Sequence, residues 1–205
     1  MIGMNLISKT AARRPSPWVA LLFLLFAPSV CVGQGTAAGK TEGGAGGEFK
    51  ATTVFLVRHA EKADVPGSDP PLSERGVARA EALARLLQSA GVKAVYTSQY
   101  LRTQQTAEPI ARRLGVAATV VPLNSKTSNP REVSEESIRE LTKRVEARAG
   151  EAVLIVGHSN SVPDVIRALG GDTVPKIDES SFDDLFVVTV YAAGCARVVH
   201  LKYGS

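Results

Sequence analysis

Short runs of consecutive apolar residues alternate along this chain with stretches in which apolar residues recur every three or four positions. Residues 54–57 and 153–156 are runs of four apolar side chains without polar alternation, typical of strands buried on both faces in a parallel sheet. Stretches with helical spacing, such as 77–87, lie between the apolar runs. The pattern predicts an α/β fold, a three-layer sandwich with a mostly parallel central sheet.

Turn and capping residues set the expected boundaries of these elements, because Gly and Pro close most of them and Ser or Asn precede the helices. We expect strands at 53–58, 94–96, 117–121, 153–156, 185–191 and 196–201, and helices within 73–91, 98–115, 134–150 and 160–170. The last two strands flank Gly194 and are expected to pair as an antiparallel edge of the sheet. Cys195, next to that turn, is expected to be a small buried side chain.

The first 50 residues do not continue this pattern. Residues 1–33 combine three basic residues and no acid with the apolar run 18–27, which is too short to span a bilayer at about 20 residues. We expect 1–33 to be a signal peptide, the protein to be exported to the periplasm or the extracellular space, and membrane contact to occur only through this segment if it is retained. Lipid attachment at Cys31 is the alternative anchor. Residues 34–50 are rich in Gly and are expected to form a flexible linker before a folded domain at 51–205.

Composition narrows the classes of partner. The net charge of +4 falls largely on the first 33 residues, and the remainder is close to neutral. A basic surface for nucleic acid is therefore not indicated. Two cysteines are present, one of them in the expected signal, so no disulfide is expected within the domain.

Histidines stand directly after two of the predicted strands. His59 follows the first strand together with Arg58, and His158 follows the second apolar run. Because the carboxyl ends of parallel strands meet at one edge of a sheet, we expect these side chains to lie close together. Arg102, one turn into a helix, is expected on the same rim. Two guanidiniums and nearby helix N-termini suit phosphate oxygens, and a neutral histidine can accept a phosphoryl group.

Three segments carry a family resemblance: LVRHAEK, LRTQQTA and VGHSN. They resemble the histidine phosphatase superfamily, in the phosphoglycerate mutase-like branch (branch 1), and the resemblance extends over residues 53–201. It implies that His59 accepts the phosphoryl group and that Arg58, Arg102 and His158 bind the phosphate. It also implies that neither a metal nor another cofactor is needed.

The proton donor is the part of the family pattern that this sequence lacks. Members that act on phosphate monoesters usually carry a glutamate after the arginine–TA helix, and the smaller branch carries an aspartate directly after the second histidine, where Ser159 stands here. The glutamates near the first of these places have no matching context: Glu108, Glu132, Glu135 and Glu136. Glu61 is the remaining candidate acid, with pairing to neighbouring charges as its alternative role. A phosphohistidine substrate, whose leaving group needs little protonation, would not require an acid.

Together these observations predict an exported, metal-independent phosphohydrolase that acts through a covalent phosphohistidine on a small phosphorylated substrate. A catalytically weak or silent phospho-ligand-binding protein and a phosphoglycerate mutase-type phosphotransferase stay open as alternatives. The spacing of His59, Glu61 and His158 also fits a two-histidine, one-carboxylate iron site, although Arg58 would repel a cation there. His200, in the last strand, is expected to be structural. The sequence indicates neither the physiological substrate nor the oligomeric state.

Overall fold

The computed structural model describes residues 50–129, 131–172, 174 and 176–204. The predicted signal peptide, the alternative anchor at Cys31 and the predicted linker up to residue 49 lie outside the described residues. Within the described part, no helix is both long enough and apolar enough to cross a membrane.

Six strands and four helices alternate along the described chain. In chain order they are β1 (Thr52–Arg58), α1 (Glu74–Leu87), β2 (Val92–Thr97), α2 (Leu101–Leu114), β3 (Ala118–Val120), α3 (Glu135–Glu146), β4 (Ala152–Gly157), α4 (Ser161–Ala168), β5 (Asp184–Ala192) and β6 (Cys195–Lys202). Each predicted element is present. Some helix boundaries differ from the prediction by a few residues. For example, α1 ends at Leu87 rather than near Gly91.

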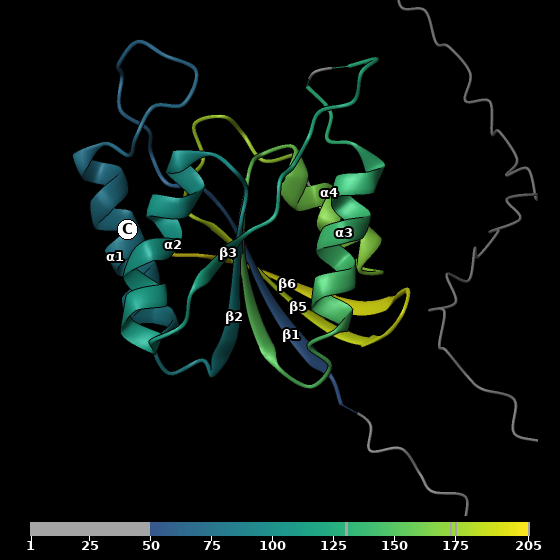
Figure 1. Cartoon of the computed structure of the whole chain (residues 1–205). Coiled ribbons are helices and arrows are strands. Elements are labelled where there is room, and N and C mark those ends of the chain that lie inside the picture. The colour runs from purple at the N-terminus through teal and green to yellow at the C-terminus, as the bar shows by residue number, and fades with distance from the viewer. Residues whose placement is uncertain (1–49, 130, 173, 175, 205) are drawn as a thin grey trace, which may run out of the picture. The chain divides into compact units, whose positions relative to one another are not determined.

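The strands form one sheet in the order β3-β2-β4-β1-β5-β6. The four strands from β3 to β1 are parallel, whereas β5 pairs antiparallel with β1 and β6 pairs antiparallel with β5. Figure 1 shows the sheet between two helical layers, α1 and α2 on one face and α3 and α4 on the other. The predicted three-layer sandwich with a mostly parallel sheet and an antiparallel edge is confirmed.

Successive side chains of the central strands point to opposite faces of the sheet, so the apolar core is divided between the two faces. On one face Val54, Leu56, Val153 and Ile155 pack against apolar side chains of α3 and α4. On the other, Val57, Leu154 and Val156 pack against those of α1 and α2. Both faces of β1 and β4 are thus buried, which explains their unbroken apolar runs.

The outer strands are less buried than the sequence pattern indicated. Cys195 is exposed, so the prediction of a buried side chain is wrong. It lies at the start of β6, which has a strand neighbour on one side only, next to the turn at Gly194. A residue at the end of an edge strand has little to pack against, and its apolar character does not change that.

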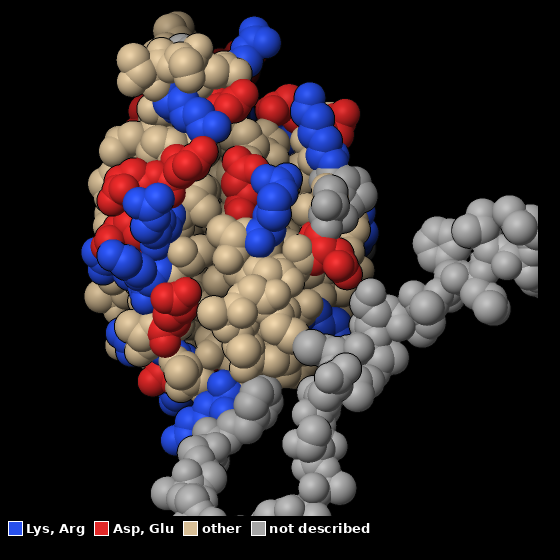
Figure 2. All heavy atoms as spheres, turned by 90° about the vertical axis from the view of Figure 1, so that its right-hand side faces the viewer, with Lys and Arg blue, Asp and Glu red and all other residues tan. Residues whose placement is uncertain are grey.

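Charged side chains on the face that carries α3 are mixed in sign. Figure 2 shows Lys and Arg beside Asp and Glu there, without a broad field of either sign. Two helical pairs on α3 contribute, Arg139 with Glu136 at 3.0 Å and Arg144 with Glu140 at 2.8 Å. Such exposed pairs contribute at most about 1 kcal/mol each.

Candidate active site

The two central strands bring the two histidines together. β1 and β4 are parallel neighbours in a register that pairs Arg58 with Gly157, and the backbone N–H of His59 donates to the Gly157 carbonyl at 2.9 Å. The rings of His59 and His158 therefore lie with their centroids 5.3 Å apart. The expectation that two strand ends form one site holds because these strands are adjacent in the sheet.

His59 is held in one tautomer. Its Nδ1 lies 2.8 Å from the carbonyl oxygen of Ala60, which can only accept, so Nδ1 carries the proton and Nε2 keeps a free lone pair. Burial lowers the pKa of His59 to about 4, and Arg58 and Arg102 add to that effect against the Ala60 hydrogen bond. At neutral pH His59 is therefore neutral, and its Nε2 lone pair is available to a ligand.

His158 is fixed by the segment that links β2 to α2. Its Nε2 lies 2.9 Å from the hydroxyl of Ser98, which in turn lies 2.9 Å from the hydroxyl of Thr103. The ring of Tyr100 meets the His158 ring edge-on, with centroids 5.3 Å apart. Burial lowers the pKa of His158 to about 3, and the neighbouring His59 and arginines lower it further. Both histidines are thus poised as neutral groups.

Arg58 is buried and is tied down by the loop that precedes β5. Its Nη1 donates to the backbone carbonyls of Asp178, Glu179 and Ser181 at 2.8 to 3.1 Å. The guanidinium carbon lies 4.2 Å from the centroid of the Phe182 ring. Its Nη2 pairs with the carboxylate of Glu179 at 2.9 Å, whereas its buried Nε has no partner within the described residues.

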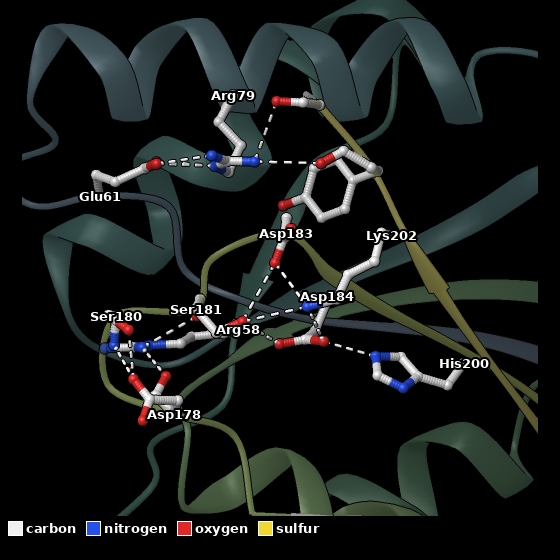
Figure 3. Close-up of polar contacts among 12 residues, drawn as sticks. Arg58, Glu61, Arg79, Asp178, Ser180, Ser181, Asp183, Asp184, His200 and Lys202 are labelled. Atoms are coloured by element: carbon white, nitrogen blue, oxygen red, sulfur yellow. Dashed lines mark hydrogen bonds and ion pairs between the residues drawn. The ribbon is translucent and has the colours of Figure 1, made fainter.

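A second network, of hydrogen bonds and ion pairs, ties that loop to the edge strands β5 and β6 (Figure 3). Ser181 donates to the buried carboxylate of Asp184 at 2.8 Å, and Asp184 also pairs with Lys202 at 2.8 Å and with His200 at 2.5 Å. His200 stacks on Phe186 of β5. Its contacts hold the edge strands and the loop, and it does not line the pocket, in agreement with the structural role predicted for it.

Arg102 lies in the first turn of α2, as expected, and its guanidinium carbon is 4.3 Å from the centroid of the Tyr100 ring. Its Nη1 pairs with Asp69 at 3.3 Å. Both oxygens of Asp69 also accept from the backbone N–H of Leu101 at 3.0 Å, at the N-terminus of the helix. The Asp69 carboxylate thus already binds both the N-terminus of α2 and Arg102. A helix N-terminus beside an arginine is an arrangement that favours anions.

All four predicted site residues line one pocket of about 700 Å³. The charged side chains that line it, within the described residues, are Arg58, Lys62, Arg102, Arg131, Arg167 and Lys176, with a single carboxylate, Glu179. The lining therefore carries a net positive charge, although Arg102 and Arg167 also pair with Asp69 and Asp164. Its position at the carboxyl edge of the parallel strands agrees with the expected location.

Glu61, the candidate acid, does not line this pocket. Its carboxylate accepts from Nε and Nη2 of Arg79 at 2.8 to 3.0 Å and pairs with Arg75 at 3.0 Å. Burial favours the protonated form, but the Arg79 hydrogen bonds and the two positive charges outweigh it and lower the pKa of Glu61. Glu61 is thus an ionised partner of α1, and the geometry does not support a role as proton donor.

Three of the other acids considered from the sequence pair elsewhere, and Glu135 lines a different cavity. Glu108 contacts Arg112, Glu132 contacts Lys126, and Glu136 contacts Arg139, all outside the pocket lining. Within the described residues, no cluster of three or more His, Cys, Asp or Glu is placed to hold a metal ion. The iron-site alternative is not supported, because Glu61 faces Arg79 instead of the two histidines.

Sequence reasoning missed the side chains that hold the four predicted residues. Glu179 and Phe182 come from a loop without apolar periodicity or a recognisable motif, and they reach Arg58 across about 120 residues of chain. Tyr100 stands two residues before Arg102, so its ring contact is a partner that local spacing could have indicated.

Comparison with protein families identifies the first half of the domain. Residues 54–124 match the histidine phosphatase superfamily (branch 1), a segment that contains Arg58, His59 and Arg102. A curated relative from Mycobacterium tuberculosis, a PE-PGRS family protein, is 38% identical over an 87-residue alignment that covers 38% of this chain and 15% of that protein. The chain therefore matches only a small part of that relative.

Solved structures share the fold at low sequence identity. The protein histidine phosphatase SixA, in complex with tungstate, superimposes with a TM-score of 0.59 at 20% identity, over 73% of this chain and 96% of that one. Phosphoglycerate mutase from Bacillus anthracis gives 0.58 at 17% identity, over 75% and 94%. A mycobacterial glucosyl-3-phosphoglycerate phosphatase gives 0.56 at 15% identity, over 76% and 100%.

Proposed function

We propose that this chain, a member of the histidine phosphatase superfamily (branch 1), hydrolyses a small phosphorylated substrate through a covalent phosphohistidine at His59. One observation carries the proposal. A histidine whose Nε2 lone pair is free stands beside a second neutral histidine and two arginines in one electropositive pocket. This arrangement suits transfer of a phosphoryl group to nitrogen.

In the first step, Arg58, Arg102 and His158 bind the phosphoryl oxygens and Nε2 of His59 attacks phosphorus. The new N–P bond forms as the bond from phosphorus to the leaving oxygen or nitrogen breaks, and the leaving atom takes a proton. In the second step a water oxygen attacks phosphorus, the N–P bond breaks, and inorganic phosphate departs. His59 is neutral again at the end, and its lowered pKa of about 4 keeps it ready for the next cycle.

Arg58 has the donors that such a step requires. Its unpartnered Nε and its Nη2, which now holds Glu179, are both suited to phosphoryl oxygens. Stacking on Phe182 and three backbone carbonyls fix the guanidinium before substrate arrives, so little ordering cost remains.

The remaining cations of the pocket favour an anionic substrate of small size. A cavity of about 700 Å³ accommodates more than a phosphate, and its lining includes Arg131 and Lys176, which form no ion pair within the described residues. We further propose that the protein works after export, with residues 1–33 as the signal, and that water rather than a second substrate is the acceptor.

The proposal is tested by hydrolysis of para-nitrophenyl phosphate by the full-length protein, comparing Arg102→Gln with Arg112→Gln. Both arginines lie on α2, but Arg112 pairs with Glu81 and Glu108 outside the pocket. Because a hydrogen bond to a charged group contributes about 1.5–3 kcal/mol, Arg102→Gln should lower kcat/KM by roughly ten- to a hundredfold, and Arg112→Gln should leave it unchanged. Phosphate binding without any turnover would contradict hydrolysis and favour the silent binding protein.

A further inference from the structure

The proposed reaction lacks an identified source for the proton that the leaving group takes. His59 is the nucleophile, and the lowered pKa of His158, about 3, leaves that ring without a second proton to give at neutral pH. An alkoxide leaves poorly unless it is protonated. A proton donor must therefore come from another group that lines the pocket.

Glu179 is the single carboxylate among the described residues that line the pocket. Its Oε1 accepts from the hydroxyl of Ser159 at 2.7 Å and its Oε2 pairs with Arg58 at 2.9 Å. The side chain is 77% exposed, so it can exchange protons with water and can move when a ligand reaches Arg58.

Ser159 ties this carboxylate to the strand end that carries the second histidine. Ser159 directly follows His158 and also lines the pocket. Its hydroxyl donates to a carboxylate that comes from the loop before β5, 20 residues further along the chain.

We propose that Glu179 is the proton donor to the leaving group, a proposal that rests on the hydrolysis proposed above. In the empty pocket the carboxylate of Glu179 pairs with Arg58. A phosphoryl group that binds Arg58 competes for Nη2 and brings negative charge next to the carboxylate, and both changes favour uptake of one proton from solvent. As the ester bond breaks, that proton passes from Glu179 to the leaving oxygen.

The second half of the cycle returns the proton. The ionised carboxylate accepts a proton from the water that attacks phosphohistidine, and the phosphate leaves with the added hydroxyl. Ser159 keeps the carboxylate in place through both steps because its hydrogen bond does not depend on Arg58.

A purely structural role for Glu179, that of holding Arg58, makes a different prediction. Loss of an Arg58 partner would weaken phosphate binding and would affect every substrate alike. Loss of a proton donor affects a substrate in proportion to the basicity of its leaving group. Nitrophenolate needs little protonation, whereas an alkoxide such as that of glycerol needs a full proton.

The test is therefore the ratio of kcat/KM for para-nitrophenyl phosphate to that for glycerol phosphate, in Glu179→Gln and in Glu136→Gln. The control residue is an acid on α3, whose carboxylate pairs with Arg139 and does not line the pocket. Because general acid catalysis contributes roughly 10²–10⁴-fold, Glu179→Gln should lower glycerol phosphate hydrolysis at least a hundredfold more than nitrophenyl phosphate hydrolysis. Glu136→Gln should leave the ratio unchanged.

Equal losses on the two substrates in Glu179→Gln would overturn the proposal and assign Glu179 to positioning. Ser159→Ala, which removes the anchor alone, should shift the ratio in the same direction by a smaller factor. Failure of the wild-type protein to hydrolyse nitrophenyl phosphate would instead refute the hydrolase proposal itself, so the two failures are distinguishable.

Discussion

Individual side chains at this site depend on partners that remove their usual freedom. A histidine in water titrates near pH 6.5 and samples two tautomers. Burial keeps His59 from titrating there, and the Ala60 carbonyl holds it in one tautomer. Arg58 and Arg102 each lie over an aromatic ring. Nε2 of His59 is therefore preorganised as a neutral nitrogen before any ligand binds.

The chain has three histidines, which makes their protonation measurable by NMR. His59 and His158 should stay neutral as the pH falls through 6.5 and become protonated only near pH 4 and pH 3, because burial disfavours the charged form. The His200→Asn variant removes the third resonance and so assigns the pair. Midpoints near 6.5 for both remaining histidines would contradict the buried, neutral site.

At the scale of elements, the turn after β1 is held by both helices on one face of the sheet. The hydroxyl of Thr106 in α2 accepts from the backbone N–H of Ala60 at 2.9 Å, and α1 contributes Arg79 to Glu61. Gly76 of α1 lies so close that an added Cβ would be 2.1 Å from the Glu61 carbonyl oxygen. Glu61 thus helps to hold the turn that follows His59, although it does not line the pocket.

Thr106→Val should test this support, since it keeps the shape and removes the acceptor of the buried Ala60 N–H. An unsatisfied buried donor costs about 1–3 kcal/mol, so the free energy of unfolding in urea should fall by that amount, and kcat should fall with it. Thr106→Ser keeps the hydroxyl and should lose less of both. Equal losses in the two variants would show that packing, not the hydrogen bond, supports the turn.

Sequence patterns were sufficient to predict the elements that depend on neighbouring residues in the chain. Apolar runs predicted β1 and β4, and strand-end histidines predicted the shared edge, since adjacent parallel strands place their ends together. Cys195 was mispredicted because burial in an edge strand depends on neighbours that the sequence does not specify. Glu179 was missed because a loop without periodicity gives no sign of where it folds back.

The whole molecule creates the site by bringing together segments from across the chain. The sheet order places β1 between β4 and β5, so the loop before β5 reaches Arg58 and the loop after β4 reaches His59. Helix α2 adds Arg102 from the same side as α1. The pocket therefore forms only when β4, β1 and the loop before β5 have come together in the folded domain.

The covalent intermediate at His59 is the central claim, and trapping it is the most direct measurement. Full-length protein quenched in alkali during turnover of an isotope-labelled phosphate ester should carry alkali-stable, acid-labile phosphate on the peptide that contains His59. His200→Asn, the matched control on an edge strand, should carry the same label, and His59→Asn should carry none and show no turnover. Turnover at the wild-type rate in His59→Asn would contradict the account.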